Sequence, residues 1–476
     1  MSTSGAAADH SEPVDRFLAT HADELRDQLV SWVSIPSIAG DPDRTADVQR
    51  SAQWIASELR TLGATTQLVP MKEGVAVIGE LRAADERPTV LVYSHHDVRR
   101  ADPANWEVTD PFVACERDGR LYGRGASDAK GQVIAHLWGL RAHLAARQGA
   151  RPAVNLVFLI DGSEERGSPG FAELIEQHAE ALACDVIVFS DTVQWRSGEP
   201  VVVTSMRGTI TASLTVEGPH RDVHSGLVSG TAPNPAHVLA EIVAALHDDD
   251  GRVAVPDFYD GVEPLSDERR REFAELSGTE DSWARRTETR TTTGERGYTA
   301  LERLWARPSL EVLSLAAGDT GSVTRSVIPA VASASISIRT VPQQDMHAVA
   351  VRLRRFLAEH MPPTVEYELT VDEYLAQPAY VTPEGTALRA LEQATARAHG
   401  TTSVNRMGNA GGGPADVLAR ALRADVLFLG TGLPEDHWHA DDESVDLATL
   451  RRGAATIAHL WDELAAGGIR GGDERR

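Results

Sequence analysis

The segment AVNLVFLIDGSEERGSPG, residues 153–170, joins a continuous apolar run to a cluster of carboxylates among glycines. A run that is apolar at nearly every position is typical of a strand buried on both faces, as in a parallel sheet. The run ends at Ile160, and Asp161, Glu164 and Glu165 follow it. A solvated charge cluster is one interpretation of these acids. The other is a metal ligand beside a general base, and only the rest of the chain can decide between them.

Three further runs have the same character: TVLVYS at 89–94, DVIVFS at 185–190 and ADVLFLG at 424–430. Apolar residues at helical spacing lie between the runs, as in 131–147, and another helix is predicted at 14–33. Strands that alternate with helices predict an α/β domain with a largely parallel sheet.

The middle of the chain instead alternates apolar and polar residues, which is typical of strands with one exposed face. Helical patterns lie between these stretches, so the predicted order is β-α-β-β-α-β, a split ferredoxin-like unit. A charged insertion interrupts it from about 250 to 308. The predicted elements are strands at 208–218, 311–316, 332–342 and 364–371, and helices at 235–247 and 344–359.

The α/β pattern resumes after this unit, which indicates that one domain is built from both ends of the chain. We expect its two parts to be 1–206 and 378–476, with an inserted α+β domain at 207–377.

The composition argues against several classes of partner. The chain has 476 residues and a formal net charge of −24, which disfavours binding to a nucleic-acid backbone or to an anionic membrane surface. Its two cysteines, Cys115 and Cys184, cannot form a disulfide framework or a cysteine-rich zinc site. The N-terminus has no apolar signal core, and no apolar run approaches the length of a membrane span. We expect a cytoplasmic protein.

Potential metal ligands follow each of the four buried strands, where sites form in open α/β sheets. Each acid or histidine has an ordinary explanation by itself, such as a helix N-cap for Asp128 or a surface pair after 89–94. Chance would not place oxygen or imidazole donors after every strand. Mixed carboxylate and imidazole donors suit zinc, manganese or cobalt. The candidates are His95, His96, Asp97, Asp128, Glu164, Glu165, Asp191, Asp436, His437 and His439.

These motifs, in this order, resemble the di-metal dipeptidase and aminoacylase family of metallopeptidases. The resemblance extends over almost the whole chain. Within the insertion and just after it, VAVPDFYDGVEPLSDE and RPSLEVLSL are similar to the branch that contains carnosine dipeptidase and the cytosolic nonspecific dipeptidase. The other matching segments are SHHDV, DPFVACERDGRLYGRGASDAKG, DGSEERGS, FSDT, RDVHSG, SVIPAVASASISIRTVP and HADDE.

The resemblance implies two divalent metal ions in each chain, with zinc the first expectation and manganese or cobalt as alternatives. It implies that His95 and Asp191 hold one ion and that Glu165 and His439 hold the other. Asp128 would bridge the two ions, and a cis peptide bond would follow it.

The resemblance also implies roles for the residues that act on the substrate. Asp97 would hydrogen-bond to His95, and Glu164 would be the general base that takes a proton from the attacking water. His224 would donate to the oxyanion from the inserted domain of a partner subunit, which makes that domain a lid and dimerisation domain.

Four residues are candidates for binding the substrate, namely Arg339, Ser326, Gly411 and Gly412. Arg339 would clamp a terminal carboxylate, Ser326 would donate a hydrogen bond, and the two glycines would let the backbone approach a ligand. Ala129 stands where the branch usually has a second aspartate, which leaves the substrate pocket less defined than the metal chemistry.

The predicted function is a dimeric di-metal hydrolase that cleaves an amide bond in a dipeptide or similar small peptide. The alternative is an N-acyl-amino-acid deacylase of the aminoacylase, acetylornithine deacetylase or succinyl-diaminopimelate desuccinylase type, with the same metal centre. A binding protein on an inactive scaffold is disfavoured because all five ligands and Glu164 are present. A di-metal phosphoesterase is disfavoured because the sequence has no evident phosphate cradle.

Overall fold

Two compact units make up the chain in the computed structural model, and each is described by itself. Unit 1 contains the residues up to Ser205, then Val381–Asn409 and the residues from Ala415 onward. Unit 2 contains Met206–Tyr380 and Ala410–Pro414. The structure describes residues 11–84, 86–276, 280–318, 325–372 and 376–469.

A nine-stranded sheet forms the centre of unit 1, in the order β1-β2-β6-β3-β7-β17-β8-β15, with β16 paired to β8. Its middle strands β6, β3, β7 and β17 are parallel, and β2 and β8 flank them in antiparallel pairing. The predicted α/β class with a largely parallel central sheet is confirmed. The bounds are β1 Thr65–Pro70, β2 Val75–Leu81, β3 Thr89–His95, β6 Asn155–Asp161, β7 Val186–Phe189, β8 Val201–Met206, β15 Tyr380–Val381, β16 Asn405–Asn409 and β17 Asp425–Phe428.

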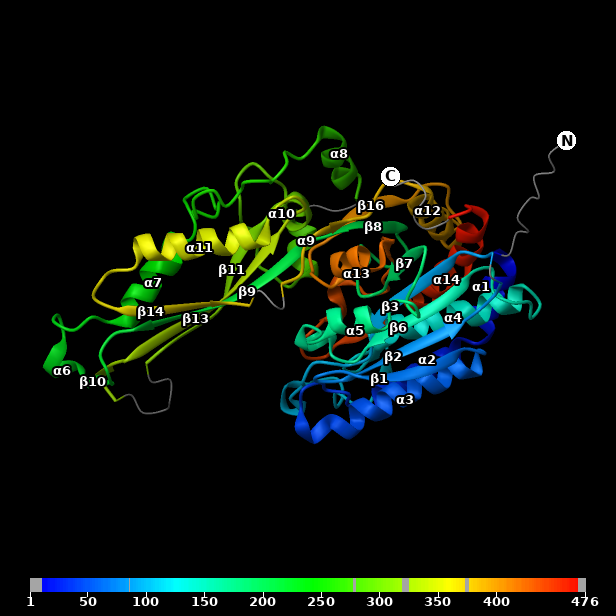
Figure 1. The fold of residues 1–476 in the computed structure, drawn as a ribbon, viewed down its shortest axis with the longest axis horizontal. Helices are drawn as coiled ribbons and strands as arrows, with labels where there is room; N and C mark the ends of the chain where they lie inside the picture. The colour runs from blue at the N-terminus through cyan, green and yellow to red at the C-terminus, as the bar shows by residue number, and fades with distance from the viewer. Residues whose placement is uncertain (1–10, 85, 277–279, 319–324, 373–375, 470–476) are drawn as a thin grey trace. The chain divides into compact units, whose positions relative to one another are not determined.

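Six helices share one hydrophobic core with this sheet. The central one, α4, is buried over most of its length because α1, α2 and α14 pack against it (Figure 1). The shorter helices α5 (Phe171–Gln177) and α13 (Ala415–Leu422) contact each other. The six helices are α1 Ser11–Thr20, α2 Ala22–Val33, α3 Thr45–Thr61, α4 Lys130–Ala146, α12 Thr386–His399 and α14 Leu447–Ala466.

The prediction of one helix at 14–33 was wrong, because the chain breaks between α1 and α2 at His21. The backbone there has φ −106° and ψ 21°, and the imidazole Nδ1 lies 2.8 Å from Phe17 O. Both helices bury the same face, so the apolar spacing continues across the break. The sequence pattern therefore does not reveal the break.

A small three-stranded sheet, β18-β5-β4, brings two distant parts of unit 1 together. Its strands are β4 (Cys115–Arg117), β5 (Arg120–Tyr122) and β18 (Ser444–Asp446), with Ser444 opposite Tyr122. This pairing places the glycine-containing loop after β5 beside the segment that precedes β18.

Unit 2 contains an antiparallel sheet in the order β11-β13-β9-β14. Apolar residues of β9 and β13 alternate toward one face, where helices α7 and α11 cover them (Figure 1). The predicted β-α-β-β-α-β order of a ferredoxin-like domain is therefore confirmed. The bounds are β9 Gly208–Glu217, α7 Pro235–Ala245, β11 Ser309–Ala317, β13 Val331–Thr340, α11 Met346–His360 and β14 Glu366–Val371.

Shorter elements complete unit 2. The strands β10 (Val223–His224) and β12 (Val327–Ile328) pair with each other. The charged insertion is helical in part. Its helices are α8 Asp267–Glu275, α9 Glu280–Arg286 and α10 Ala300–Ala306. A further short helix, α6 Ser225–Val228, directly follows β10. None of the helices in the described residues of either unit has the length and apolar character needed to cross a bilayer.

Candidate metal centre

Three parallel strands end at the same edge of the central sheet and carry candidate ligands there. His95 is the last residue of β3, and Glu164 and Glu165 begin a 3-10 helix (Glu164–Arg166) just after β6. Asp191 follows β7. The register of β3 and β6 brings these residues close together, because His95 lies directly beside Asp161 in this parallel pair.

Two groups of three candidate ligands form at this edge, and in each group one donor atom per residue lies within 4.8 Å of the others. The first group is His95, Glu164 and Asp191, and the second is Asp128, Glu165 and His439. Asp128 enters from the loop before α4, and the peptide bond that follows it is cis, as the resemblance implied. All six residues belong to unit 1.

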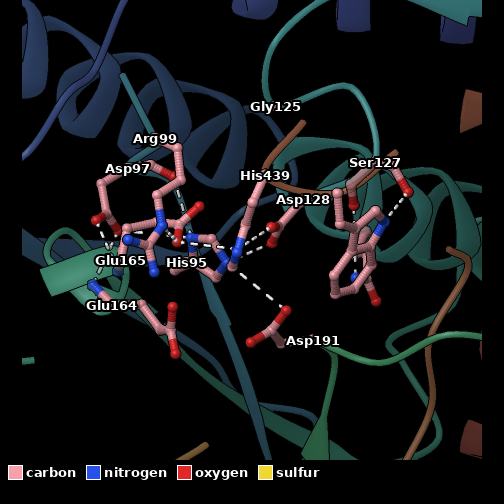
Figure 2. Close-up of polar contacts among 12 residues, drawn as sticks. His95, Asp97, Arg99, Gly125, Ser127, Asp128, Glu164, Glu165, Asp191 and His439 are labelled. Carbon is pink, nitrogen blue, oxygen red and sulfur yellow. Dashed lines mark hydrogen bonds and ion pairs between the residues drawn. The ribbon is translucent and has the colours of Figure 1, made fainter. Parts of the chain in front are cut away.

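Asp128 lies between the two histidines, with one carboxylate oxygen toward each (Figure 2). Its Oδ1 is 3.1 Å from His95 Nε2, and its Oδ2 is 3.0 Å from His439 Nε2. His95 Nε2 is also 3.7 Å from Asp191 Oδ1, and His439 Nε2 is 3.2 Å from Glu165 Oε2. Asp128 therefore has the position that a carboxylate needs in order to bridge two cations.

The donor atoms fit divalent cations. Asp128 Oδ2 is buried and accepts no hydrogen bond of good geometry within the described residues, although His439 Nε2 is close. Buried carboxylate oxygens are normally hydrogen-bonded or bound to a cation. A cation between this oxygen and the imidazole would satisfy both, and the mixed oxygen and nitrogen donors suit zinc, manganese or cobalt.

The acids and histidines of this site shift one another's pKa values. Burial lowers the pKa of His95, but the carboxylates of Asp128 and Asp191 outweigh it, so that its pKa is raised well above the usual value. Burial likewise lowers the pKa of His439, but the carboxylates of Asp128 and Glu165 raise it to about 10. Opposing burial, the same two histidines hold the pKa of Asp128 below its usual range. The acids of the site therefore favour the positively charged forms of the two histidines.

Glu164 differs from the other acids of the centre. Burial raises its pKa well above the usual value, and the neighbouring charge of Asp191 adds to this effect. Figure 2 shows no hydrogen bond or ion pair from its carboxylate to the residues drawn. A carboxylate with a raised pKa beside the ligand groups has the properties of a general base, as well as the reach to bind a metal.

Asp97 explains how two adjacent glutamates are held in different directions. Its Oδ1 accepts the backbone N–H of Glu164 at 3.0 Å, and its Oδ2 accepts that of Glu165 at 3.1 Å. His95 Nδ1 lies 3.0 Å from Asp97 O and 3.5 Å from Asp97 Oδ1. One buried residue thus fixes the turn that carries both glutamates and contacts a histidine of the centre.

A buried carboxylate that sequence reasoning missed organises the Asp128 loop. Glu443 is fully buried and accepts backbone N–H groups from Gly125, Ser127 and Asp128 at 3.0–3.1 Å. Arg124 Nη1 donates to Glu443 Oε2 at 2.7 Å and balances its charge. In the sequence, HADDE gives no sign that its last acid is buried while Asp441 is exposed and Asp442 is partly exposed.

A second buried acid, Asp436, ties the same loop to the segment that precedes His439. Ser127 donates its hydroxyl to Asp436 Oδ2, and Leu433 N donates to the same oxygen at 2.8 Å. Trp438 Nε1 donates to Ser127 Oγ at 2.7 Å. The loop that carries Asp128 and the segment that carries His439 are therefore held together by hydrogen bonds.

The predicted substrate-binding residues and His224 belong to unit 2, where they form two clusters. His224, at the end of β10, is exposed, and its Nδ1 lies 3.4 Å from Ser326 O. Ser225 N donates to the same oxygen at 2.9 Å. The first cluster therefore joins the two residues that sequence reasoning placed on separate motifs.

The second cluster surrounds Arg339. Its guanidinium donates to Thr209 Oγ1, and a Cβ at Gly412 would lie 3.2 Å from Arg339 Nη1 and 2.1 Å from Thr209 Oγ1. Only glycine fits this close approach, and Gly411 precedes it. Arg207 is buried nearby, with its Nε donating to Ala410 O at 3.2 Å. Burial, followed by the charge of Arg339, lowers the pKa of Arg207 to about 9, which marks an excess of positive charge.

Comparison with known proteins gives one family match. The family model described as peptidase family M20/M25/M40 matches residues 91–463.

Curated relatives match along most of their length. The Cys-Gly metallodipeptidase dug1 of Schizosaccharomyces pombe is 28% identical over 466 residues, which cover 93% of this chain and 96% of that protein. The Beta-Ala-His dipeptidase of Homo sapiens is 27% identical over 471 residues, which cover 95% of this chain and 92% of that protein.

Solved structures are similar over the same extent. Human carnosine dipeptidase 1 has a TM-score of 0.85 at 26% identity, covering 96% of this chain and 99% of that chain. Dug1p from Saccharomyces cerevisiae has a TM-score of 0.84 at 23% identity, covering 96% and 98%, and this likeness bears on the fold alone.

Binding of metal should release protons. With its pKa raised to about 10, His439 is protonated at neutral pH in the metal-free protein, whereas an imidazole ligand must be neutral. Protons compete with the metal below that pKa, so affinity should rise with pH through the neutral range. Calorimetric titration of zinc into chelator-treated protein should give heats that depend on the ionisation enthalpy of the buffer, with about one proton or more released.

A matched pair of variants isolates this proton. His439→Gln should release fewer protons, and His220→Gln, which removes an exposed histidine elsewhere, should leave the number unchanged. Heats that are equal in all buffers would show that the histidine does not lose a proton to the metal.

Proposed function

Because the chain belongs to peptidase family M20/M25/M40, we propose that it is a di-metal hydrolase that cleaves the amide bond of dipeptides. One observation carries the proposal. Asp128 lies between His95 and His439, 3.1 Å and 3.0 Å from their Nε2 atoms, in two ligand groups at the carboxyl edge of a parallel sheet. Glu164 belongs to the first group and is also the candidate base.

The resemblance to di-metal dipeptidases that the sequence motifs predicted is confirmed by the family match and by the relatives. These relatives are named for hydrolysis of Cys-Gly and β-Ala-His dipeptides. Their names support a small peptide with a free terminal carboxylate as the substrate of this hydrolase.

We assign one ion to His95 and Asp191, the other to Glu165 and His439, and a bridging position to Asp128. Zinc is the first choice, and manganese and cobalt are the alternatives. When bound, such a pair of ions polarises the scissile carbonyl and lowers the pKa of the attacking water.

In this proposal Glu164 moves the proton. Its carboxylate takes a proton from the attacking water and delivers it to the nitrogen of the leaving amine. A raised pKa favours the second half of this cycle, because a carboxylate with a higher pKa holds the proton until the leaving group needs it. Asp97 acts by holding the backbone of Glu164, whose N–H donates to Asp97 Oδ1 at 3.0 Å.

The cluster around Arg339 is proposed to bind the terminal carboxylate of the substrate. Within the described residues Arg339 forms no ion pair with an acid, and Arg207 adds a second positive charge nearby. Gly411 and Gly412 would let the backbone come close to a ligand that the guanidinium holds. Ser326 and His224 are proposed to donate hydrogen bonds to the substrate and to its oxyanion.

We further propose a homodimer in which unit 2 is the dimerisation domain. The edge strand β11 supports this assignment, since Leu313 and Leu315 are 65% and 56% exposed on it. Exposed apolar side chains on an edge strand favour pairing with another chain. The dimer would allow His224 to act on the centre of the partner subunit.

The cytoplasm is the proposed compartment. Cys115 is exposed and is not in a disulfide, and a reducing compartment preserves such a thiol.

An N-acyl-amino-acid deacylase is the second candidate, and one residue favours it. Ala129, buried directly after Asp128, supplies no carboxylate at a position beside the metal centre. A dipeptide carries an ammonium group that needs an acidic partner, whereas an N-acyl amino acid does not.

A substrate panel tests the proposed function. The purified protein, stripped with a chelator and reloaded separately with Zn²⁺, Mn²⁺ and Co²⁺, should hydrolyse dipeptides with a free carboxylate and lose this activity when the chelator is added again. Matched N-acyl amino acids should react more slowly. Faster hydrolysis of the N-acyl compounds would support the second candidate, and no metal-dependent hydrolysis of either class would refute both.

The paired glutamates should give opposite phenotypes. Glu164→Gln should retain two metal ions and lose about two to four orders of magnitude in kcat, because the amide cannot accept a proton. Glu165→Gln should lose metal, since a ligand oxygen with negative charge is removed. Elemental analysis and single-substrate kinetics measure the two effects. An exchange of phenotypes would show that Glu164 is the ligand.

Complementation tests the role of His224 across the dimer. His224→Ala and Glu164→Gln should each be nearly inactive while binding metal normally. Mixed dimers would combine Glu164 of one chain with His224 of the other in one intact site. At equal amounts, about half of the dimers are mixed, so activity should recover to about a quarter of the wild-type value.

Exchange of subunits must be demonstrated in the same sample, for example by mass spectrometry of differently tagged chains. No recovery after confirmed exchange would mean that His224 acts within its own chain or has no part in the reaction.

A further inference from the structure

Arg99 contacts the centre from the same turn that supplies His95 and Asp97. Its Nε donates to Glu165 Oε2 at 2.7 Å (Figure 2). The side chain of Arg99 is 48% exposed, whereas that of Glu165 is 4% exposed. A cation at the rim of the site thus bonds directly to a carboxylate inside it.

The oxygen that Arg99 binds is the one that faces the second ligand group. Glu165 Oε2 lies 3.2 Å from His439 Nε2, so the same atom is shared by the guanidinium and the proposed metal position. The backbone of Glu165 is held by Asp97, 3.1 Å from its N–H. Glu165 is therefore fixed at both ends by residues of one turn, and its carboxylate has little freedom to rotate.

The first ligand group has no such contact. Asp191, the corresponding acid, lies 3.7 Å from His95 Nε2, and no arginine or lysine of the described residues forms an ion pair with it. Among the described residues, the ion pairs of Asp128 are with the two histidines. Each proposed metal position has one histidine and one acid besides Asp128, and among the described residues Glu165 pairs with an arginine whereas Asp191 does not.

The guanidinium keeps its charge in this position. An arginine guanidinium stays protonated in proteins, because it loses its proton only far above neutral pH. A positive charge bonded to a ligand oxygen repels a divalent ion that binds the same oxygen, and it draws electron density away from that donor. The same bond orients the carboxylate, which favours ligation. The two effects of Arg99 oppose each other.

We propose that Arg99 makes the two metal positions unequal, so that the position of Glu165 and His439 binds its ion more weakly and exchanges it faster than that of His95 and Asp191. Arg99 is a positioning residue that acts through Glu165. The inference rests on the proposed di-metal function and adds which of the two ions is the labile one. Repulsion by the charge outweighs the orienting effect of the hydrogen bond, because Asp97 already holds the backbone of Glu165.

Substitution of Arg99 separates charge from hydrogen bonding. Arg99→Gln retains an amide donor and removes the charge, and Arg99→Met removes both. Arg99→Lys retains the charge. Arg100 provides the matched control, since its side chain is 75% exposed and pairs with Asp41, so Arg100→Gln removes the same charge from the adjacent residue.

The readout is the affinity for each ion, measured by competition of Zn²⁺ and Mn²⁺ with a chelating dye in the absence of substrate. Wild-type protein should bind two ions with different affinities. Arg99→Gln should lower the Kd of the weaker ion by about tenfold or more and leave the tighter one unchanged. Arg99→Met should shift it in the same direction, while Arg99→Lys and Arg100→Gln should stay close to wild type.

Each outcome decides a separate question. An unchanged or increased Kd for the weaker ion in both Arg99→Gln and Arg99→Met, with thermal unfolding showing a folded protein, would overturn the role of Arg99. A shift of equal size in Arg100→Gln would also overturn it, because the effect would then be that of net charge. Failure of the wild-type protein to bind two ions would instead refute the di-metal function itself.

Discussion

The metal centre depends on the buried carboxylate of Glu443. Three backbone N–H groups of the loop that carries Asp128 donate to it, at 3.0–3.1 Å, and Arg124 balances its charge. Without this acceptor the three N–H groups would be buried without partners, at a cost of about 1–3 kcal/mol each. Glu443 stands four residues after His439. The position of the proposed bridging carboxylate is therefore linked to that of a proposed ligand through one short segment.

The location of the site could be predicted because it follows from local pattern and one topological rule. Continuous apolar runs predicted β3, β6, β7 and β17, and parallel strands place their carboxyl ends at one edge. His95, Glu165 and Asp191 therefore had to approach each other once the runs were recognised as parallel strands. The same reasoning gave the order of elements in unit 2, where strict alternation marks the exposed face.

The supporting interactions could not be predicted, because they join residues far apart in sequence and have no periodic signal. Glu443 is indistinguishable in sequence from the two acids before it, neither of which is buried, and its burial depends on the pairing of β18 with β5. The contact of Arg99 with Glu165 depends on how the turn after β3 lies against the turn after β6. The break at His21 escaped detection because both helices bury the same face.

The candidate site of unit 1 is rich in acids, whereas the Arg339 cluster of unit 2 is rich in positive charge. Unit 1 concentrates acids where their field draws in cations, and unit 2 places Arg339 close to Arg207 without an acid in an ion pair to Arg339 among the described residues. A net charge of −24 repels an anionic substrate at long range. Recognition of a peptide carboxylate must then be local, by desolvated arginines at contact distance, where a bidentate pair is strong and little screened. Under the proposed function, this requirement would account for the partial burial of Arg339, whereas an exposed arginine would be neutralised by the acidic surface.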